Sequence, residues 1–125
     1  NDTLLKTVLA GVPDYASYFT ASQLPTGGLT PIAAQLRMIL RLIQARSALG
    51  MRRQIFFAAL GGFDTHDDQL NDHAGLLTML SNAIADFTDA AEAIGVGNNV
   101  TLFTASDFNR TYNSNGKGSD HAWGN

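Results

Sequence analysis

The sequence contains no cysteine among its 125 residues. Thiolate catalysis and iron–sulfur clusters are therefore excluded, because both need cysteine sulfur. The absence leaves the cellular compartment open, since proteins without disulfides occur in reducing and in oxidising surroundings. Any catalytic or metal-binding chemistry in this chain is expected to use carboxylate, hydroxyl and imidazole groups.

Positive charge is also scarce: 8 Lys and Arg residues stand against 11 Asp and Glu, which gives a net charge of −3. Nucleic-acid binding depends on clustered Lys and Arg, so the composition argues against a nucleic-acid partner. No apolar run approaches the roughly 20 residues that cross a bilayer, so no transmembrane segment is expected. The first residues lack the pattern of a signal peptide. Because the chain begins with Asn1, we expect a processed chain or a fragment.

Apolar residues are abundant, at 45% of the chain, and charged residues make up 15%. Disordered chains carry less apolar content and a more unbalanced charge, so the composition indicates one folded domain. A folded chain of this size buries roughly two thirds of the surface that its unfolded form exposes.

Three segments have the apolar spacing of helices. The first covers residues 2–11. The second covers about residues 31–49 and begins at Pro31, a residue favoured at the first helical position. The third covers about residues 69–94 and ends before Gly95, which favours a helix C-terminus.

Two short apolar runs, at about residues 54–60 and 100–105, have the profile of strands that are covered on both faces. A predicted helix lies between them, so the order strand, helix, strand predicts a right-handed crossover and a parallel strand pair. A covered sheet needs more than two strands, and no third strand is evident. The fold class is therefore predicted as α/β, with residues 1–125 forming one fragment of a larger domain that ends in a polar loop from Thr111 onward.

Side chains of metal-ligand type follow both predicted strands, where open α/β sheets bind their ligands. Carboxylate oxygen and imidazole nitrogen suit Zn²⁺, and carboxylates also suit Ca²⁺, Mg²⁺ and Mn²⁺. Bound metal ions of this kind activate water and stabilise the oxygens of an ester. The candidate ligands are Asp64, His66, Asp107, Asp120 and His121.

The same region has a structural interpretation. Asp67 and Asp68 suit the cap or the positive end of the following helix. Arg110 suits either an anionic ligand or an ion pair with Asp107. His73 is expected at the surface or behind the ligands. No nucleophile elbow and no phosphate-binding loop is present, so no nucleophile is assigned.

Four phrases occur in order from about residue 29 to the last residue: QIFFAALGGFDTH, LLTMLSNAIADF, VTLFTASDFNRT and SNGKGSDHAWGN. Together they resemble the DUF1501 proteins, exported bacterial proteins grouped with the sulfatase-like branch of the alkaline phosphatase superfamily. The resemblance implies a partial α/β/α sandwich, a periplasmic or secreted location, and metal-binding Asp and His residues at the carboxyl edge of the sheet. The family phrase Ser-Asp/Glu-Phe-Gly-Arg-Thr matches Asp107 and Arg110, with Asn109 at the position of its glycine.

The resemblance also implies a function, namely a metal-dependent hydrolase of a phosphate or sulfate ester. In that hypothesis Asp64, His66, Asp120 and His121 bind metal, and Arg110 binds the anionic substrate. The superfamily's nucleophile belongs to an N-terminal region outside residues 1–125, so the isolated chain is expected to be inactive. The alternative is a non-catalytic binding protein of the same fold, in which the Asp and His residues are structural.

Overall fold

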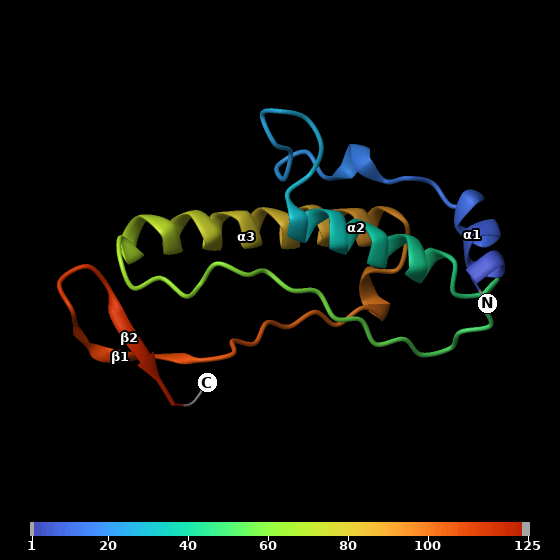
Figure 1. The fold of residues 1–125 in the computed structure, drawn as a ribbon. Helices are drawn as coiled ribbons and strands as arrows, with labels where there is room; N and C mark the ends of the chain where they lie inside the picture. Colours follow the sequence, from blue (N-terminus) through green and yellow to red (C-terminus); the bar gives the residue numbers. More distant parts are fainter. Residues whose placement is uncertain (1, 124–125) are drawn as a thin grey trace.

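The structure is a computed structural model and describes residues 2–123. Helices α2 and α3 lie side by side, and a small β-hairpin lies beyond the N-terminal end of α3 (Figure 1). The protein is thus of mixed α/β class. Within the described residues, no helix is long and apolar enough to cross a membrane. The elements in chain order are α1 (Asp2–Ala10), η1 (Ala16–Tyr18), α2 (Pro31–Gln44), α3 (Gln69–Ala93), η2 (Gly97–Asn99), β1 (Asn109–Ser114) and β2 (Ser119–Ala122).

The hydrophobic core lies between α2 and α3. Leu40 of α2 and Phe19, which follows η1, are fully buried there. Helix α3 contributes Phe87 together with small alanine side chains, which let the two helices approach closely. The apolar stripe predicted for α2 is confirmed by its buried residues Ile32, Ala33, Leu36, Leu40 and Ile43.

Helix α2 begins at Pro31 as predicted but ends at Gln44, five residues before the predicted end. Residues 45–50 form turns instead. Gly50 has φ 68°, and the Met51 N–H donates to the Arg46 carbonyl at 2.7 Å, which closes the last turn. Within these turns the N–H groups of Arg46 and Gly50 donate to carbonyls three residues back, which interrupts the four-residue pattern of an α-helix, and apolar spacing alone does not reveal this change.

Helix α3 matches its prediction closely, and its end shows why. Gly95 has φ 77°, its N–H donates to the Glu92 carbonyl, and the Val96 N–H donates to the Ala91 carbonyl. This pair of hydrogen bonds is the Schellman motif, which satisfies carbonyls at a helix C-terminus. The glycine that marked the helix end in the sequence therefore does so through its left-handed backbone.

The predicted parallel strand pair is wrong for the described residues. Residues 54–60 and 100–105 run as extended chain along the helices in Figure 1, but no backbone hydrogen bond joins them and neither is a strand. The partial α/β/α sandwich is likewise not observed. The predicted covering of both faces is not observed either, because residues 101–105 are exposed. A strand requires a hydrogen-bonded neighbouring strand, and an apolar sequence alone does not supply one.

Residues 54–60 nevertheless keep the two-residue alternation of a strand. Phe56, Ala58 and Leu60 pack against the core, whereas Ile55 and Phe57 are 100% and 90% exposed. The side-chain amide of Gln35 in α2 stands where a strand neighbour would be. Its Nε2 donates to the carbonyl of Ala59 at 2.9 Å, and its Oε1 accepts from the Ala59 N–H at 3.0 Å.

The strands that do form lie in the stretch predicted as loop. Strands β1 and β2 pair antiparallel, with Asn109 opposite Ala122 and Arg110 opposite His121. The Asn115 side chain closes the turn between them by accepting from the N–H groups of Lys117 (2.9 Å) and Gly118 (2.7 Å). Such asparagine turns are common between paired strands. The hairpin thereby brings the C-terminal Asp and His residues back toward the loop that precedes α3.

Candidate functional site

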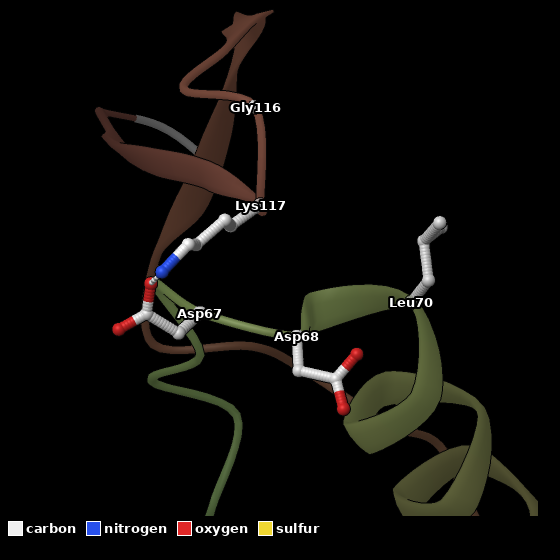
Figure 2. A pocket seen from close by; sticks show the side chains of 5 residues that line it. All are labelled: Asp67, Asp68, Leu70, Gly116 and Lys117. Atoms are coloured by element: carbon white, nitrogen blue, oxygen red, sulfur yellow. Dashed lines mark ion pairs between the residues drawn. The ribbon is translucent and has the colours of Figure 1, made fainter.

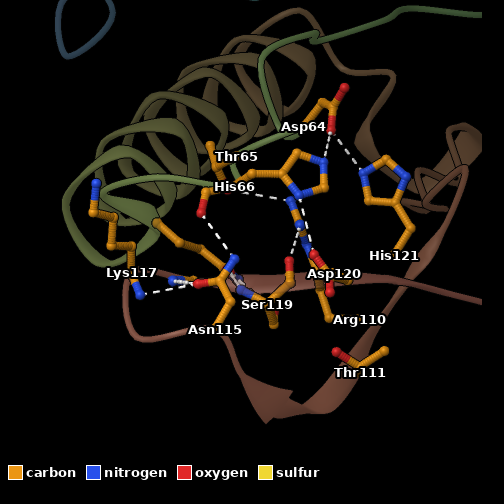
Figure 3. A network of polar contacts seen from close by, with 12 residues as sticks. Asp64, Thr65, His66, Arg110, Thr111, Asn115, Lys117, Ser119, Asp120 and His121 are labelled. Carbon is orange, nitrogen blue, oxygen red and sulfur yellow. Dashed lines mark hydrogen bonds and ion pairs between the residues drawn. The ribbon is translucent and has the colours of Figure 1, made fainter.

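The site is formed by two segments that are distant in the sequence. The loop after residues 54–60 carries Asp64 and His66, and β2 carries His121. Figure 3 shows the two imidazole rings facing one carboxylate. Asp64 Oδ1 lies 2.7 Å from His121 Nε2 and 2.9 Å from His66 Nε2.

These three residues have the donor set of a metal centre. One ligand atom of each lies within 4.8 Å of the others, and all three side chains are exposed. In tetrahedral coordination with bonds of about 2.0–2.1 Å, neighbouring ligand atoms are about 3.4 Å apart. The two contacts to Asp64 are shorter than that by roughly half an ångström, and small rotations of exposed side chains cover this difference. The cluster therefore fits a divalent ion with three protein ligands and an open fourth position.

Asp120 lies on the other side of His66. Its Oδ1 is 3.5 Å from His66 Nδ1, so the His66 ring stands between the two carboxylates of Asp64 and Asp120. In metal sites a ligating histidine commonly directs its second ring nitrogen at a carboxylate, which orients the ring. Asp120 has the position of such an orienting group.

An aromatic stack holds the His121 ring from its other side. The Phe108 ring stacks on His121 with centroids 4.0 Å apart, and Arg110 Cζ lies 4.9 Å from the Phe108 centroid. The His66 and His121 rings are themselves 4.9 Å apart. His121 is thus oriented by packing as well as by its contact with Asp64.

Arg110 joins the two segments of the site. Its Nη1 donates to the Ser119 carbonyl at 2.5 Å, and its Nη2 donates to the Phe63 carbonyl and to Thr65 Oγ1 at 3.2 Å. The expected pairing with Asp107 is not among its contacts. Its role as a substrate ligand stays a prediction.

A second group of contacts docks the hairpin on the start of α3. Gln69 Oε1 accepts from the Ser119 N–H at 2.7 Å and from Ser119 Oγ at 3.0 Å, and the Gln69 N–H donates to the Lys117 carbonyl. Gly118 lies so close that a Cβ there would be 2.8 Å from Gln69 Oε1 and 3.1 Å from the His66 carbonyl. Any side chain at this position would require Gln69 or the hairpin to shift. Sequence reasoning missed Gln69 and Gly118, and the Asn115-Gly116 turn signal was the one clue to the hairpin that places them.

The remaining predicted residues lie around the cluster. Asp107 is exposed and is not one of the three clustered ligands. Asp68 occupies the N-cap position of α3, but its carboxylate accepts from the Asn71 side chain at 2.8 Å instead of capping the backbone. Asp67 pairs with Lys117 across an open pocket that also includes Leu70 (Figure 2). His73 packs edge-on against Phe63, behind the loop.

The carboxyl group of Asp64 is affected by both rings. Its pKa is lowered from the ordinary aspartate value, chiefly by the hydrogen bond from His121 and further by His66. Asp64 is therefore ionised at neutral pH, which is the form that accepts hydrogen bonds and binds cations.

Comparison with known proteins assigns the family. No curated relative and no solved structure shows a significant match to the chain. A family model described as a protein of unknown function, DUF1501, matches residues 20–125. This range covers most of the sequence and contains the whole candidate site. The chain therefore belongs to the DUF1501 family.

Proposed function

We propose that Asp64, His66 and His121 bind one divalent metal ion, Zn²⁺ being the best fit, in a metal-dependent hydrolase of phosphate or sulfate esters. The observation that supports this most is the meeting of one carboxylate oxygen and two imidazole nitrogens from segments 57 residues apart. Two nitrogen ligands and one oxygen ligand with an open position are the set used by catalytic zinc sites.

The surroundings of the cluster support the same proposal. The three side chains are exposed, so a substrate can reach the open position. Asp120 faces the second nitrogen of His66 and would hold the ring in place, so we assign it an orienting role and not a direct contact with the ion. A bound ion of this kind would lower the pKa of water and polarise an ester oxygen. The sulfatase-like relationship and an exported location are part of this proposal and rest on the motif resemblance.

The experiment that tests the metal centre uses the three histidines of the chain. Zinc binding is measured by isothermal titration calorimetry on the wild type and on His66→Ala, His121→Ala and His73→Ala. We expect the first two variants to lose binding at least tenfold, whereas His73→Ala keeps it because its ring contacts Phe63 outside the cluster. Equal binding by all four proteins would contradict the proposal.

A second candidate function has its own observation. The contact of Asp64 with His121 and that of His66 with Asp120 already join the loop to the hairpin without an ion. In a non-catalytic binding protein these residues would serve only that structural purpose. That case predicts no zinc binding in the wild type, together with a hairpin that detaches in His121→Ala. Because the superfamily's nucleophile is expected outside residues 1–125, hydrolysis of p-nitrophenyl phosphate and p-nitrophenyl sulfate with added zinc is measured on a protein that includes that region, where turnover distinguishes an enzyme from a protein that only binds metal.

A further inference from the structure

Arg110 has three hydrogen-bond acceptors, and each lies within two residues of a member of the cluster in the sequence. The Phe63 carbonyl precedes Asp64, and Thr65 stands between Asp64 and His66. The Ser119 carbonyl precedes Asp120 and His121. One side chain from β1 thus holds the backbone on both sides of the site (Figure 3).

We propose that Arg110 is the positioning residue of the Asp64, His66 and His121 cluster, holding the loop against β2 so that the three ligand atoms converge. Its consequence for metal binding rests on the proposed function. The effect of Arg110 on the distance between the His66 and His121 rings does not depend on the proposed function, because the two rings are in contact without an ion.

The chemistry of the guanidinium explains why arginine suits this position. A planar group with five donors binds several acceptors at fixed angles, and hydrogen bonds from a charged donor are stronger than neutral ones. The same group lies over the Phe108 ring, which in turn stacks on His121. Arg110 therefore acts on the cluster through the backbone and through the orientation of one ring. Lysine, with a single charged nitrogen, cannot occupy all three acceptors in this geometry.

The contacts also argue against the substrate role that the sequence suggested. An arginine that grips an anion bidentately usually presents both terminal nitrogens to it. Here Nη1 and Nη2 both donate to protein oxygens, and Thr65, one of the acceptors, is buried. Freeing them for an anion would break these hydrogen bonds between the loop and the hairpin.

The test begins without metal. The His66 and His121 rings are 4.9 Å apart, which gives nuclear Overhauser effects between their ring protons. We expect Arg110→Ala to lose these signals while those of the buried Phe19 and Phe87 remain. Arg37→Ala is the matched control, because Arg37 is a partly buried arginine of α2 that pairs with Asp14 and does not contact the cluster. Added guanidinium ion is expected to restore the ring signals in Arg110→Ala.

Zinc titration supplies the second readout. Removal of such supporting groups typically weakens metal binding by about 10- to 100-fold, and we expect that loss for Arg110→Ala and a smaller one for Arg110→Lys. Ring signals and zinc affinity like the wild type in Arg110→Ala would overturn the inference. If that variant unfolds, Arg110→Lys decides, and wild-type ring signals in it would overturn the inference equally. A wild type that binds no zinc refutes the proposed function alone, since the metal-free ring signals still test the positioning role.

Discussion

Gly118→Ala is the substitution for which the structure predicts the most specific effect. A Cβ at this position would lie 2.8 Å from Gln69 Oε1, 3.0 Å from Gln69 Cβ and 3.1 Å from the His66 carbonyl. Contacts that short do not persist, so either the Gln69 side chain or the hairpin must move. Because the His66 carbonyl belongs to the backbone, rotation of Gln69 alone does not relieve the crowding.

The size of the effect follows from the hydrogen bonds that this movement breaks. Gln69 Oε1 accepts from both the N–H and the Oγ of Ser119. At about 0.5–1.5 kcal/mol for each bond, their loss destabilises the docked hairpin by about 1–3 kcal/mol. Amide hydrogen exchange at Ser119 should then accelerate roughly 5- to 140-fold, since about 1.4 kcal/mol corresponds to a factor of ten. Amides in the α2 and α3 core should be unaffected, because the hairpin lies outside it.

The control for this measurement is Gly61→Ala. Gly61 has no atom within 4 Å of an added Cβ and does not need a left-handed backbone. We expect exchange at Ser119 to be unchanged in that variant. If Gly118→Ala also leaves Ser119 exchange unchanged, the close docking of the hairpin on α3 is not what holds the two halves of the site together.

Three further substitutions test the core, the exposed segment and the electrostatics. Leu40→Ala should lower the free energy of unfolding by about 2–5 kcal/mol in a denaturant titration, because Leu40 is fully buried, whereas Met38→Ala on the exposed side should change it by less than about 0.5 kcal/mol. Phe57→Thr should reduce self-association in analytical ultracentrifugation, because an exposed apolar residue on extended chain favours edge-to-edge contacts. Leu70→Thr should leave self-association unchanged, because Leu70 is similarly exposed but lies in a helix. His121→Ala should raise the pKa of Asp64 toward its ordinary value in a carbon-13 NMR titration, since the His121 hydrogen bond is the main cause of its lowering. A lowered pKa contributes stability at pH values above the ordinary carboxyl range, and this contribution is lost as pH falls through the pKa of the folded state. His121→Ala should therefore be less stable than the wild type at neutral pH, and the two should become equally stable in acid.

The helices could be predicted from the sequence because local and tertiary requirements agree in them. The apolar stripe of α2 predicts a helix locally and also supplies the side chains of the core. The glycine after α3 ends that helix at the position where the sequence predicts its end. Residues 54–60 show where this agreement fails. Their alternation is that of a strand, but a strand is defined by its hydrogen-bonded neighbour, and Gln35 supplies only a side-chain substitute at Ala59.

The candidate site was predicted in its residue types but not in its geometry. Asp64 and His66 were both among the candidate ligands, and in the structure their side chains contact each other. The hairpin was missed because its strands are polar and exposed and carry no apolar alternation. The distinct positions of Asp120 and His121 depend on that hairpin, so the sequence could not separate a ligand from an orienting group.

The hydrogen positions that the cluster requires with and without a metal ion lead to a prediction about His66. An ionised Asp64 only accepts hydrogen bonds, so in the absence of metal the His66 Nε2 that faces it must carry a hydrogen. Metal binding needs the lone pair of that same nitrogen, which in a neutral ring places the hydrogen on Nδ1, opposite Asp120. Nitrogen-15 spectra of the imidazole ring should therefore show His66 protonated at Nδ1 when zinc is added. Asp120→Asn, which removes the charge that faces this hydrogen, should weaken zinc binding, whereas Asp89→Asn on the exposed side of α3 should not. A zinc-bound His66 that keeps its hydrogen on Nε2 would show that zinc binds through Nδ1, the nitrogen that faces Asp120, and this would contradict the orienting role proposed for Asp120.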